Sequence, residues 1–249
     1  MGLLSKETFI CLDCESTGLD TDKDRVIEIA AVKFTLEKHL DQTESLVDPQ
    51  MVIPEESIAI HHITDKMVQG KPLIKELLPD FLEFVGRHTI MGHGIQYDID
   101  ILTSEAKRHN IPCKLKSNLI IDTLRLARLY GDSPINSLEA LRKHFNVLAE
   151  GAHRAMNDVI VNIEVFKRLI EKFKTTKQLF DRLAKPIAMR AMPLGKHKGR
   201  PFRDIPLQYL QWAANKDFDQ DLLYSIRSEL KKRKKGGTFS QASNPFSSL

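Results

Sequence analysis

Two acidic side chains, Asp13 and Glu15, stand two positions apart at the end of an apolar run near the start of the chain. Residues 8–14 are rich in strand formers, so both carboxylates would project from one face of a strand, at a sheet edge where ligands usually bind. Two like charges this close are unfavourable unless a positive charge lies between them, and hard divalent cations accept oxygen ligands. Taken alone, the pair is more simply explained as two solvated acids at a strand end.

Three further residues strengthen the case for a site. Asp98 opens an expected helix, and Asp158 lies at the edge of the apolar stripe of the clearest helix in the chain, residues 155–173. His153 precedes Asp158 by five positions, a rotation of about 140° on a continuous helix. The two side chains would therefore share a site only if His153 lies in the loop before the helix. From there, a histidine of near-neutral pKa could deprotonate a water molecule.

Three segments of the chain resemble the exonuclease motifs of the DEDD superfamily. They are FICLDCESTGL at residues 9–19, GHGIQYD at 92–98 and HRAMND at 153–158. The resemblance is closest to the DnaQ-like branch, which includes the proofreading subunit of bacterial DNA polymerase III, and it covers about residues 6–175. Its spaced elements occur in the family's order, which argues against a chance match. A histidine five positions before the last aspartate identifies the histidine type of the third motif.

This resemblance implies a role for each residue. Asp13, Glu15 and Asp158 would ligate one metal ion, Asp13 and Asp98 would hold a second, and His153 would be the general base. The expected cofactors are two Mg²⁺ or Mn²⁺ ions roughly 3.5–4 Å apart, which serve the attacking water and the leaving 3′-oxygen. The expected substrate contacts are the first-motif residues and a histidine that matches a position near the terminal nucleotide: Ser16, Thr17, Gly18, Leu19 and His61. One departure is Gly94, because family members commonly have Asn after the histidine of the second motif.

The predicted function is therefore a 3′→5′ exonuclease that releases nucleoside 5′-monophosphates from single-stranded 3′ ends of DNA, in proofreading or repair. The resemblance also suggests a DNA polymerase catalytic subunit as a partner. Two alternatives stay open. The enzyme could trim RNA 3′ ends, since nothing in the sequence separates ribose from deoxyribose, or the chain could be a module that docks on a polymerase or a nucleic acid, with incidental catalysis. The sequence does not indicate an oligomeric state.

The composition is that of an ordinary globular protein. Of the 249 residues, 42% are hydrophobic and 28% are charged, which is enough to bury a core. No apolar run approaches the roughly 20 residues that a membrane-spanning helix needs. The first residues do not resemble a secretory signal, and three cysteines, an odd number, do not suggest a disulfide framework. We therefore expect a cytoplasmic protein with no membrane partner.

The C-terminal part is strongly basic. Residues 185–235 carry 13 Lys or Arg and five Asp or Glu, a net charge of +8, whereas the remainder carries a net charge of −4. Such a segment is either a binding site for a polyanion or a solvated basic tail. It resembles a small domain of uncertain role that is appended to some DnaQ-like exonucleases. Lys196, Lys198 and Arg200 are predicted to contact phosphates. Tyr209 and Trp212 are predicted to be core residues rather than stacking platforms for bases.

The order of the expected elements indicates an α/β protein. Strands over residues 8–14, 25–34 and 38–47 come first, and helices and strands then alternate. The resemblance implies a ribonuclease H-like exonuclease fold, a mixed central sheet flanked by helices, followed by a small, mainly helical C-terminal domain. The predicted boundaries are an exonuclease domain at residues 1–175, a linker at 176–189, a small basic domain at 190–235 and a disordered tail at 236–249.

Overall fold

The computed structural model of the chain describes residues 2–133, 135–148 and 154–241, with side chains as far as Lys235. The chain forms two compact units, Met1–Leu183 and Ala184–Leu249. Each unit has its own apolar core, so each is described by itself.

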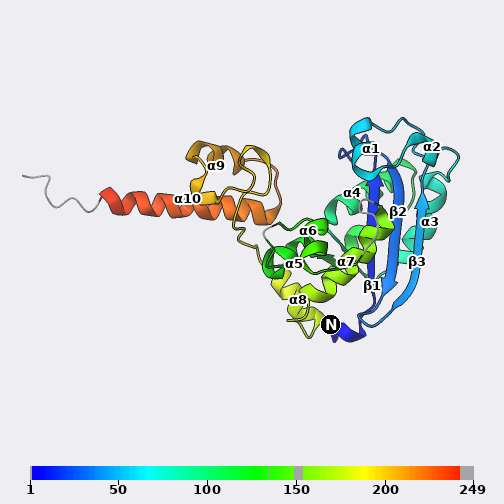
Figure 1. The fold of residues 1–249 in the computed structure, drawn as a ribbon, viewed down its shortest axis with the longest axis horizontal. Coiled ribbons are helices and arrows are strands. Elements are labelled where there is room, and N and C mark those ends of the chain that lie inside the picture. The colour runs from blue at the N-terminus through cyan, green and yellow to red at the C-terminus, as the bar shows by residue number, and fades with distance from the viewer. Residues whose placement is uncertain (1, 134, 149–153, 242–249) are drawn as a thin grey trace, which may run out of the picture. The chain divides into compact units, whose positions relative to one another are not determined.

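A five-stranded mixed sheet forms the centre of the first unit (Figure 1). Its strands are β1 (Phe9–Ser16), β2 (Val26–Phe34), β3 (His39–Leu46), β4 (Thr89–Gly92) and β5 (Ile120–Asp122). Their order across the sheet is β3-β2-β1-β4-β5. Strand β2 runs antiparallel to both β1 and β3, whereas β4 runs parallel to both β1 and β5. This sheet confirms the predicted α/β class. The sequence analysis does not predict β5, because three residues are too few to show a period.

Helices cover both faces of this sheet (Figure 1). One face is covered by α3 (Ile74–Val85) and α4 (Gln96–Arg108). The other face is covered by α5 (Thr123–Tyr130), α6 (Leu138–His144), α7 (Ala155–Leu169) and α8 (Thr176–Leu183). The shorter helical segments of this unit are η1 (Leu4–Lys6), α1 (Glu55–His61), α2 (Asp65–Val68) and η2 (Leu115–Ser117).

The central strand β1 is buried on both faces, and its alternation decides which helices each side chain meets. Phe9 and Cys11 pack in the same core cluster as α7, whereas Ile10, Leu12 and Cys14 pack in the cluster that contains α3 and α4. Successive side chains of a strand point to opposite faces. Asp13 and Glu15 therefore continue the row of Phe9 and Cys11, on the α7 side of the sheet.

An apolar stripe holds α7 against that side of the sheet. Val159, Ile163 and Phe166 are fully buried, at the spacing of four and three that the sequence shows. The Phe166 ring stands edge-on to Phe9 of β1 at 5.5 Å and to Phe34 of β2 at 6.4 Å between ring centroids. Aromatic pairs of this geometry add about 0.5–1.5 kcal/mol each beyond the burial of area. The stripe fixes the rotation of α7, and therefore the direction in which its first turn points.

The helix α8 belongs to the first unit, although the sequence analysis places it in a linker. Leu179 and Leu183 are buried in the core that α7 shares with the sheet. The carbonyl of Leu183 accepts a hydrogen bond from Arg125 Nη1 of α5 at 2.6 Å. The first unit therefore extends to Leu183 rather than to residue 175.

The second unit is small and mainly helical, as predicted. It contains η3 (Gly195–His197), η4 (Phe202–Asp204), α9 (Leu207–Ala213) and α10 (Gln220–Gln241). Asp221 of α10 is fully buried and accepts the amide of Ile187 at 3.0 Å, which ties the incoming chain to this helix. The helix continues to Gln241, past residue 236, where the sequence analysis begins a disordered tail. Residues 242–249 lie outside the described part.

The prediction that Trp212 is a core residue is wrong. Its side chain is 51% exposed, whereas Leu210 and Ala213 of the same helix are fully buried. Two residues advance a helix by about 200°, so Trp212 points away from the side on which Leu210 meets the core. Tyr209 is only partly buried and packs against the edge of the core.

Among the described residues, no helix combines the length and the apolar character needed to cross a membrane.

Candidate active site

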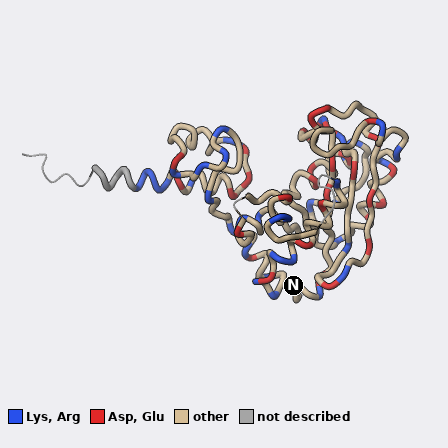
Figure 2. Tube along the Cα trace, in the orientation of Figure 1, with Lys and Arg blue, Asp and Glu red and all other residues tan. Residues whose placement is uncertain are grey.

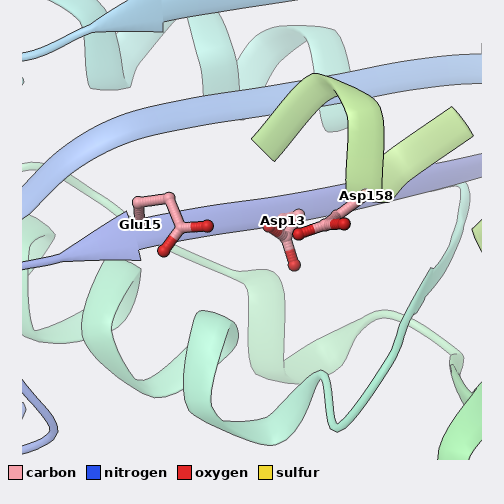
Figure 3. A group of neighbouring side chains, drawn as sticks. All are labelled: Asp13, Glu15 and Asp158. Carbon is pink, nitrogen blue, oxygen red and sulfur yellow. The ribbon is translucent and has the colours of Figure 1, made fainter. Parts of the chain in front are cut away.

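The carboxylates of Asp13, Glu15 and Asp158 converge near the end of β1 (Figure 3). Each side chain offers one oxygen, and these oxygens all lie within 4.8 Å of one another. Asp13 and Glu15 come from the strand face that packs on α7, and Asp158 comes from the first turn of α7 itself. The group offers only carboxylate oxygens, which are the ligands that suit Mg²⁺ and Mn²⁺.

A fourth acid, Asp98, approaches the same strand from α4. It lies in the first turn of that helix and is buried. Its Oδ1 accepts a hydrogen bond from the backbone amide of Cys14 at 2.9 Å. Cys14 separates Asp13 from Glu15 in the chain, so this bond holds Asp98 next to the three converged carboxylates, although outside the group within 4.8 Å.

Burial and nearby negative charges raise the pKa of three acids, Asp13, Glu15 and Asp98. Burial, followed by the negative charges of Asp98 and Glu15, raises the pKa of Asp13 well above its usual range. Burial, followed by the charge of Asp158, raises the pKa of Glu15 to about 8. Burial also raises the pKa of Asp98 to about 7, although the Cys14 amide acts in the opposite direction. A divalent cation would compensate this repulsion, so the residues present fit a metal site.

Another acid, Glu28 of β2, organises the start of α7. It lies opposite Glu15 in the β1–β2 register and is almost completely buried. Its Oε1 accepts hydrogen bonds from Arg154 Nη2 at 2.6 Å and Nε at 3.0 Å, and its Oε2 accepts the amide of Ala155 at 2.9 Å. This carboxylate therefore satisfies a free amide at the N-terminus of the helix that carries Asp158.

No role for Glu28 was predicted from the sequence. The available signal was a charged residue inside the otherwise apolar run VIEIAAV of β2. A charged side chain is almost never fully buried without a partner, so its position indicated one. Nothing local identified that partner as Arg154, which is 126 positions away.

The expected general base, His153, lies outside the described residues. His153 was predicted to reach the site only if the helix starts after this position, and α7 begins at Ala155. The next residue, Arg154, is the N-cap residue of α7 and is held by Glu28. The assignment of His153 as the base stays a prediction.

The loop after β1 contains the first-motif residues that are expected to bind substrate: Ser16, Thr17, Gly18 and Leu19. Tyr97, the neighbour of Asp98, holds this loop, because its hydroxyl lies 2.6 Å from Ser16 Oγ and donates to the carbonyl of Gly18. Burial raises the pKa of Tyr97 to about 12, so the hydroxyl keeps its proton. Thr17 is buried, whereas Leu19 is 85% exposed. The loop thus presents an exposed apolar side chain on a backbone that is held in place.

The helix α1 is attached to the same loop. Ser57 Oγ donates to the carbonyl of Thr17 at 2.7 Å. His61, the last residue of α1, is buried, and its Nδ1 accepts the amide of Ile63 at 3.0 Å. The structure therefore places His61 on an element that is bonded to the first-motif loop, with the orientation of its ring fixed by the turn after α1.

The second motif departs from the family at Gly94, and a backbone bond holds this position. Gly94 has a φ angle of 74°, in the left-handed region that glycine and asparagine adopt most readily. Its amide donates to Asp122 Oδ1 at 2.9 Å, and the same oxygen accepts the amide of Leu124 at the start of α5. The end of β4 is thus tied to α5 without a side chain at position 94.

Lys196, Lys198 and Arg200 belong to the second unit, where their side chains are exposed. Their predicted contact with the substrate stays a prediction.

The profile of the exonuclease family (RNase_T) matches residues 10–166, a range that includes Asp13, Glu15, Asp98 and Asp158. The chain belongs to this exonuclease family, and to its DnaQ-like branch, as the three motifs predict. It is therefore assigned to the nuclease class of hydrolases.

Several relatives support this assignment. The epsilon subunit of DNA polymerase III from Aquifex aeolicus is 34% identical over 166 residues, which cover 66% of this chain and 81% of that subunit. The epsilon subunit from Treponema pallidum is 32% identical over 168 residues, which cover 65% of this chain and 76% of that subunit. A PolC-type DNA polymerase III from Caldanaerobacter subterraneus is 35% identical over 167 residues. That match covers 67% of this chain but only 12% of the polymerase, so the chain spans a small part of such relatives.

Solved structures show the same fold. Exonuclease X in complex with 5′-overhanging duplex DNA is similar with a TM-score of 0.55 and 26% identity, covering 70% of this chain and 98% of that one. E. coli exonuclease I in complex with a dA16 oligonucleotide has a TM-score of 0.62 at 20% identity, covering 72% of this chain and 43% of that one, a likeness of fold alone. The first unit thus has the ribonuclease H-like exonuclease fold that the resemblance implied.

Residues 181–226, most of which lie in the second unit, match a different family, described as "Putative quorum-sensing-regulated virulence factor". The match includes Lys196, Lys198, Arg200 and the exposed Trp212. This description names no ligand or reaction.

Proposed function

We propose that this chain is a metal-dependent 3′→5′ exonuclease that releases nucleoside 5′-monophosphates from DNA 3′ ends, in proofreading or repair. The observation that carries this proposal is the convergence of Asp13, Glu15 and Asp158 within 4.8 Å, in a chain of the exonuclease family. A phosphodiester is anionic, as is this cluster, so the substrate would be repelled unless cations neutralised both.

Asp13, Glu15 and Asp158 would hold one Mg²⁺ or Mn²⁺ ion, and Asp13 and Asp98 would hold a second. Such a pair of ions lowers the pKa of the attacking water and neutralises charge at the scissile phosphate. The raised pKa values of Asp13 and Glu15 support this assignment, because a bound cation would favour the ionised carboxylates that burial and nearby negative charges disfavour.

The chain's own groups would do the rest. His153 would accept the proton of the attacking water, a role that typically contributes about 10²–10⁴-fold. Glu28 would keep Arg154 and the first turn of α7 in place, and the exposed Leu19 would contact the terminal nucleotide. The roles of Glu28 and Leu19 are positional, so they depend on the hydrogen bonds that hold the start of α7 and the first-motif loop.

We propose DNA rather than RNA because the similar proteins are named for DNA polymerases and exonuclease X is bound to DNA. The same names make a DNA polymerase catalytic subunit the proposed partner. Size-exclusion chromatography of this chain with such a subunit tests the partner. Co-elution is expected, and separate elution at micromolar concentrations would contradict it.

Digestion of a 5′-labelled single-stranded DNA, beside its RNA counterpart, tests the activity. With Mg²⁺ or Mn²⁺ we expect a ladder that shortens from the 3′ end, with DNA cleaved faster than RNA, and no cleavage in EDTA. Asp158→Asn should be inactive, whereas Asp80→Asn, an exposed acid on α3, should behave as the wild type. Faster cleavage of RNA would favour the trimming alternative. No cleavage of either strand by folded protein would favour the docking module.

The first-motif loop offers a second test at Gly18. A Cβ at this position would lie 2.6 Å from Asp24 Oδ2. Asp24 cannot move freely, because its carboxylate accepts Thr17 Oγ1 at 2.9 Å and the amide of Asp20 at 2.8 Å. We expect Gly18→Ala to displace the loop and raise KM about tenfold, with the metal-dependent rise in Tm preserved. Steady-state kinetics and melting curves measure both, and an unchanged KM would remove the loop from substrate binding.

A further inference from the structure

The only tryptophan of the chain, Trp212, is exposed on the second unit. It lies on α9, and 51% of its surface is accessible to solvent. Large aromatic side chains contribute most of the binding energy of many interfaces, so a half-exposed indole is a candidate contact site.

The exposed ring is held in place by its neighbours. The Tyr209 ring lies 5.2 Å from it between centroids, and Lys216 Nζ stands 5.0 Å from the Trp212 centroid. A ring that is already ordered loses little side-chain entropy when it binds a ligand. About half of the surface of Trp212 remains accessible even with both neighbours against it.

A basic loop, residues 192–200, adjoins this aromatic pair. The ring of His197, in the loop, stands edge-on to Tyr209 with 4.5 Å between centroids. The backbone of Gly195 approaches so closely that a Cβ there would lie 3.0 Å from the Tyr209 hydroxyl. The loop is closed by backbone hydrogen bonds from Gly199 to Met192 at 2.8 Å and from Met192 to Arg200 at 3.0 Å. The loop and the α9 rings therefore form one connected surface.

The cations of this surface are exposed and could bind an anion. Lys196, Lys198 and Lys216 are exposed. Within the described part of the chain, no ion pair joins any of these ammonium groups to a carboxylate. Residues 184–249 carry 13 Lys or Arg and five Asp or Glu, a net charge of +8, and Figure 2 shows the blue run of basic residues along α10. The surface is thus suited to a polyanion.

We propose that the second unit binds single-stranded nucleic acid, with an unpaired base stacked on Trp212 and the neighbouring phosphates at Lys196, Lys198 and Lys216. Stacking on an aromatic ring next to a basic track is how proteins bind single strands without reading their sequence. An unpaired base exposes the face that stacking needs, whereas a duplex buries it. The inference rests on the proposed function and extends it to a second contact with the same substrate.

Because Trp212 is the only tryptophan, its fluorescence reports on this site alone. The full-length chain would be titrated in EDTA with a 12-nucleotide oligo(dT) and with an abasic oligonucleotide of the same length. We expect oligo(dT) to quench the fluorescence and the abasic strand, which keeps the phosphates, to leave it nearly unchanged. Equal quenching by both strands would overturn the stacking.

Variants separate the two parts of the surface. Trp212→Ala should weaken oligo(dT) binding, measured by anisotropy, roughly tenfold or more. Tyr224→Ala, another exposed aromatic of this unit, should leave it unchanged. The Lys196→Ala, Lys198→Ala double variant should reduce the salt dependence, with the slope of log K against log salt falling by about 0.7 for each lost phosphate contact.

The outcomes are distinguishable from those of the cleavage assay. Quenching without metal-dependent cleavage would support this inference and remove the proposed function. Cleavage with an unquenched Trp212 and a wild-type affinity of Trp212→Ala would overturn the inference alone, and a protein partner would then be the better occupant of the exposed ring.

Discussion

Replacing Asp13 by Asn is expected to abolish metal-dependent cleavage and, at the same time, to stabilise the metal-free protein. The loss of activity should be at least about 10³-fold, because a bound cation supplies several kcal/mol of transition-state stabilisation and each 1.36 kcal/mol is tenfold in rate. The gain in stability follows from removing one negative charge from a partly buried cluster that repels it. We expect a gain on the order of 1 kcal/mol, which is roughly 2–4 °C in Tm for a protein of this size.

The same reasoning sets the sign of a pH dependence. The pKa of Glu15 is raised from 4.5 to about 8 in the folded, metal-free protein. The native state therefore binds more protons than the unfolded state between these values, and the free energy of unfolding falls as pH rises from about 4.5 to 8. In the Asp13→Asn variant the free energy of unfolding should fall less over this pH range, because one source of the repulsion within the cluster is gone.

Melting curves at pH 6 and pH 8, in EDTA and in Mg²⁺ or Mn²⁺, measure both effects. The metal should stabilise the wild type, because any ligand that binds only the native state raises the free energy of unfolding. The Asp13→Asn variant should gain little stability from the metal. The exposed Asp80→Asn again serves as the control for loss of one charge. A metal-free Asp13→Asn protein that is less stable than the wild type would contradict the electrostatic account of this site.

Replacing Arg154 by Leu is expected to damage both folding and catalysis. Glu28 is 4% exposed and would be left as a buried carboxylate without its partner, opposite Glu15. Breaking such a pair costs about 3–5 kcal/mol when both groups are buried, and the partial exposure of Arg154 reduces our expectation to about 1–3 kcal/mol. A shift in the first turn of α7 would also displace Asp158, and a displacement of about 1 Å can cost about 10²-fold in rate.

A matched control lies on the same helix. Arg168 pairs with Glu171 at 3.8 Å, with both side chains more than 60% exposed, so Arg168→Leu should change neither Tm nor kcat measurably. The double variant Glu28→Gln, Arg154→Leu should be no less stable than Arg154→Leu, since it no longer contains an unpaired buried charge. Equal behaviour of Arg154→Leu and Arg168→Leu would show that the Glu28–Arg154 pair does not position the site.

Together, these predictions concern two requirements of the same site. In the proposed mechanism Asp13, Glu15 and Asp158 share a cation, and the repulsion among them would make the metal-free protein less stable than it could be. Glu28 and Arg154 must hold the start of α7 against that repulsion. Stabilising substitutions at functional sites commonly reduce activity for this reason.

Much of this arrangement could be predicted from the sequence alone. The spacing of two between Asp13 and Glu15 predicts one strand face, and the stripe through Val159 and Phe166 predicts the rotation of α7. Both follow from the backbone periods of strands and helices, which are local properties of the chain. The same periods led to the α/β class, and the three motifs led to the exonuclease family.

The tertiary structure decided which distant groups meet. Asp98 bonds to the amide of Cys14, 84 positions away, and Glu28 bonds to Arg154, 126 positions away. It also decided that Trp212 is exposed, against the prediction from its residue type. The period of a helix or strand determines on which side of that element a residue lies. The groups that a residue meets on that side depend on how elements remote in sequence pack together, and the local spacing of residues does not determine that packing.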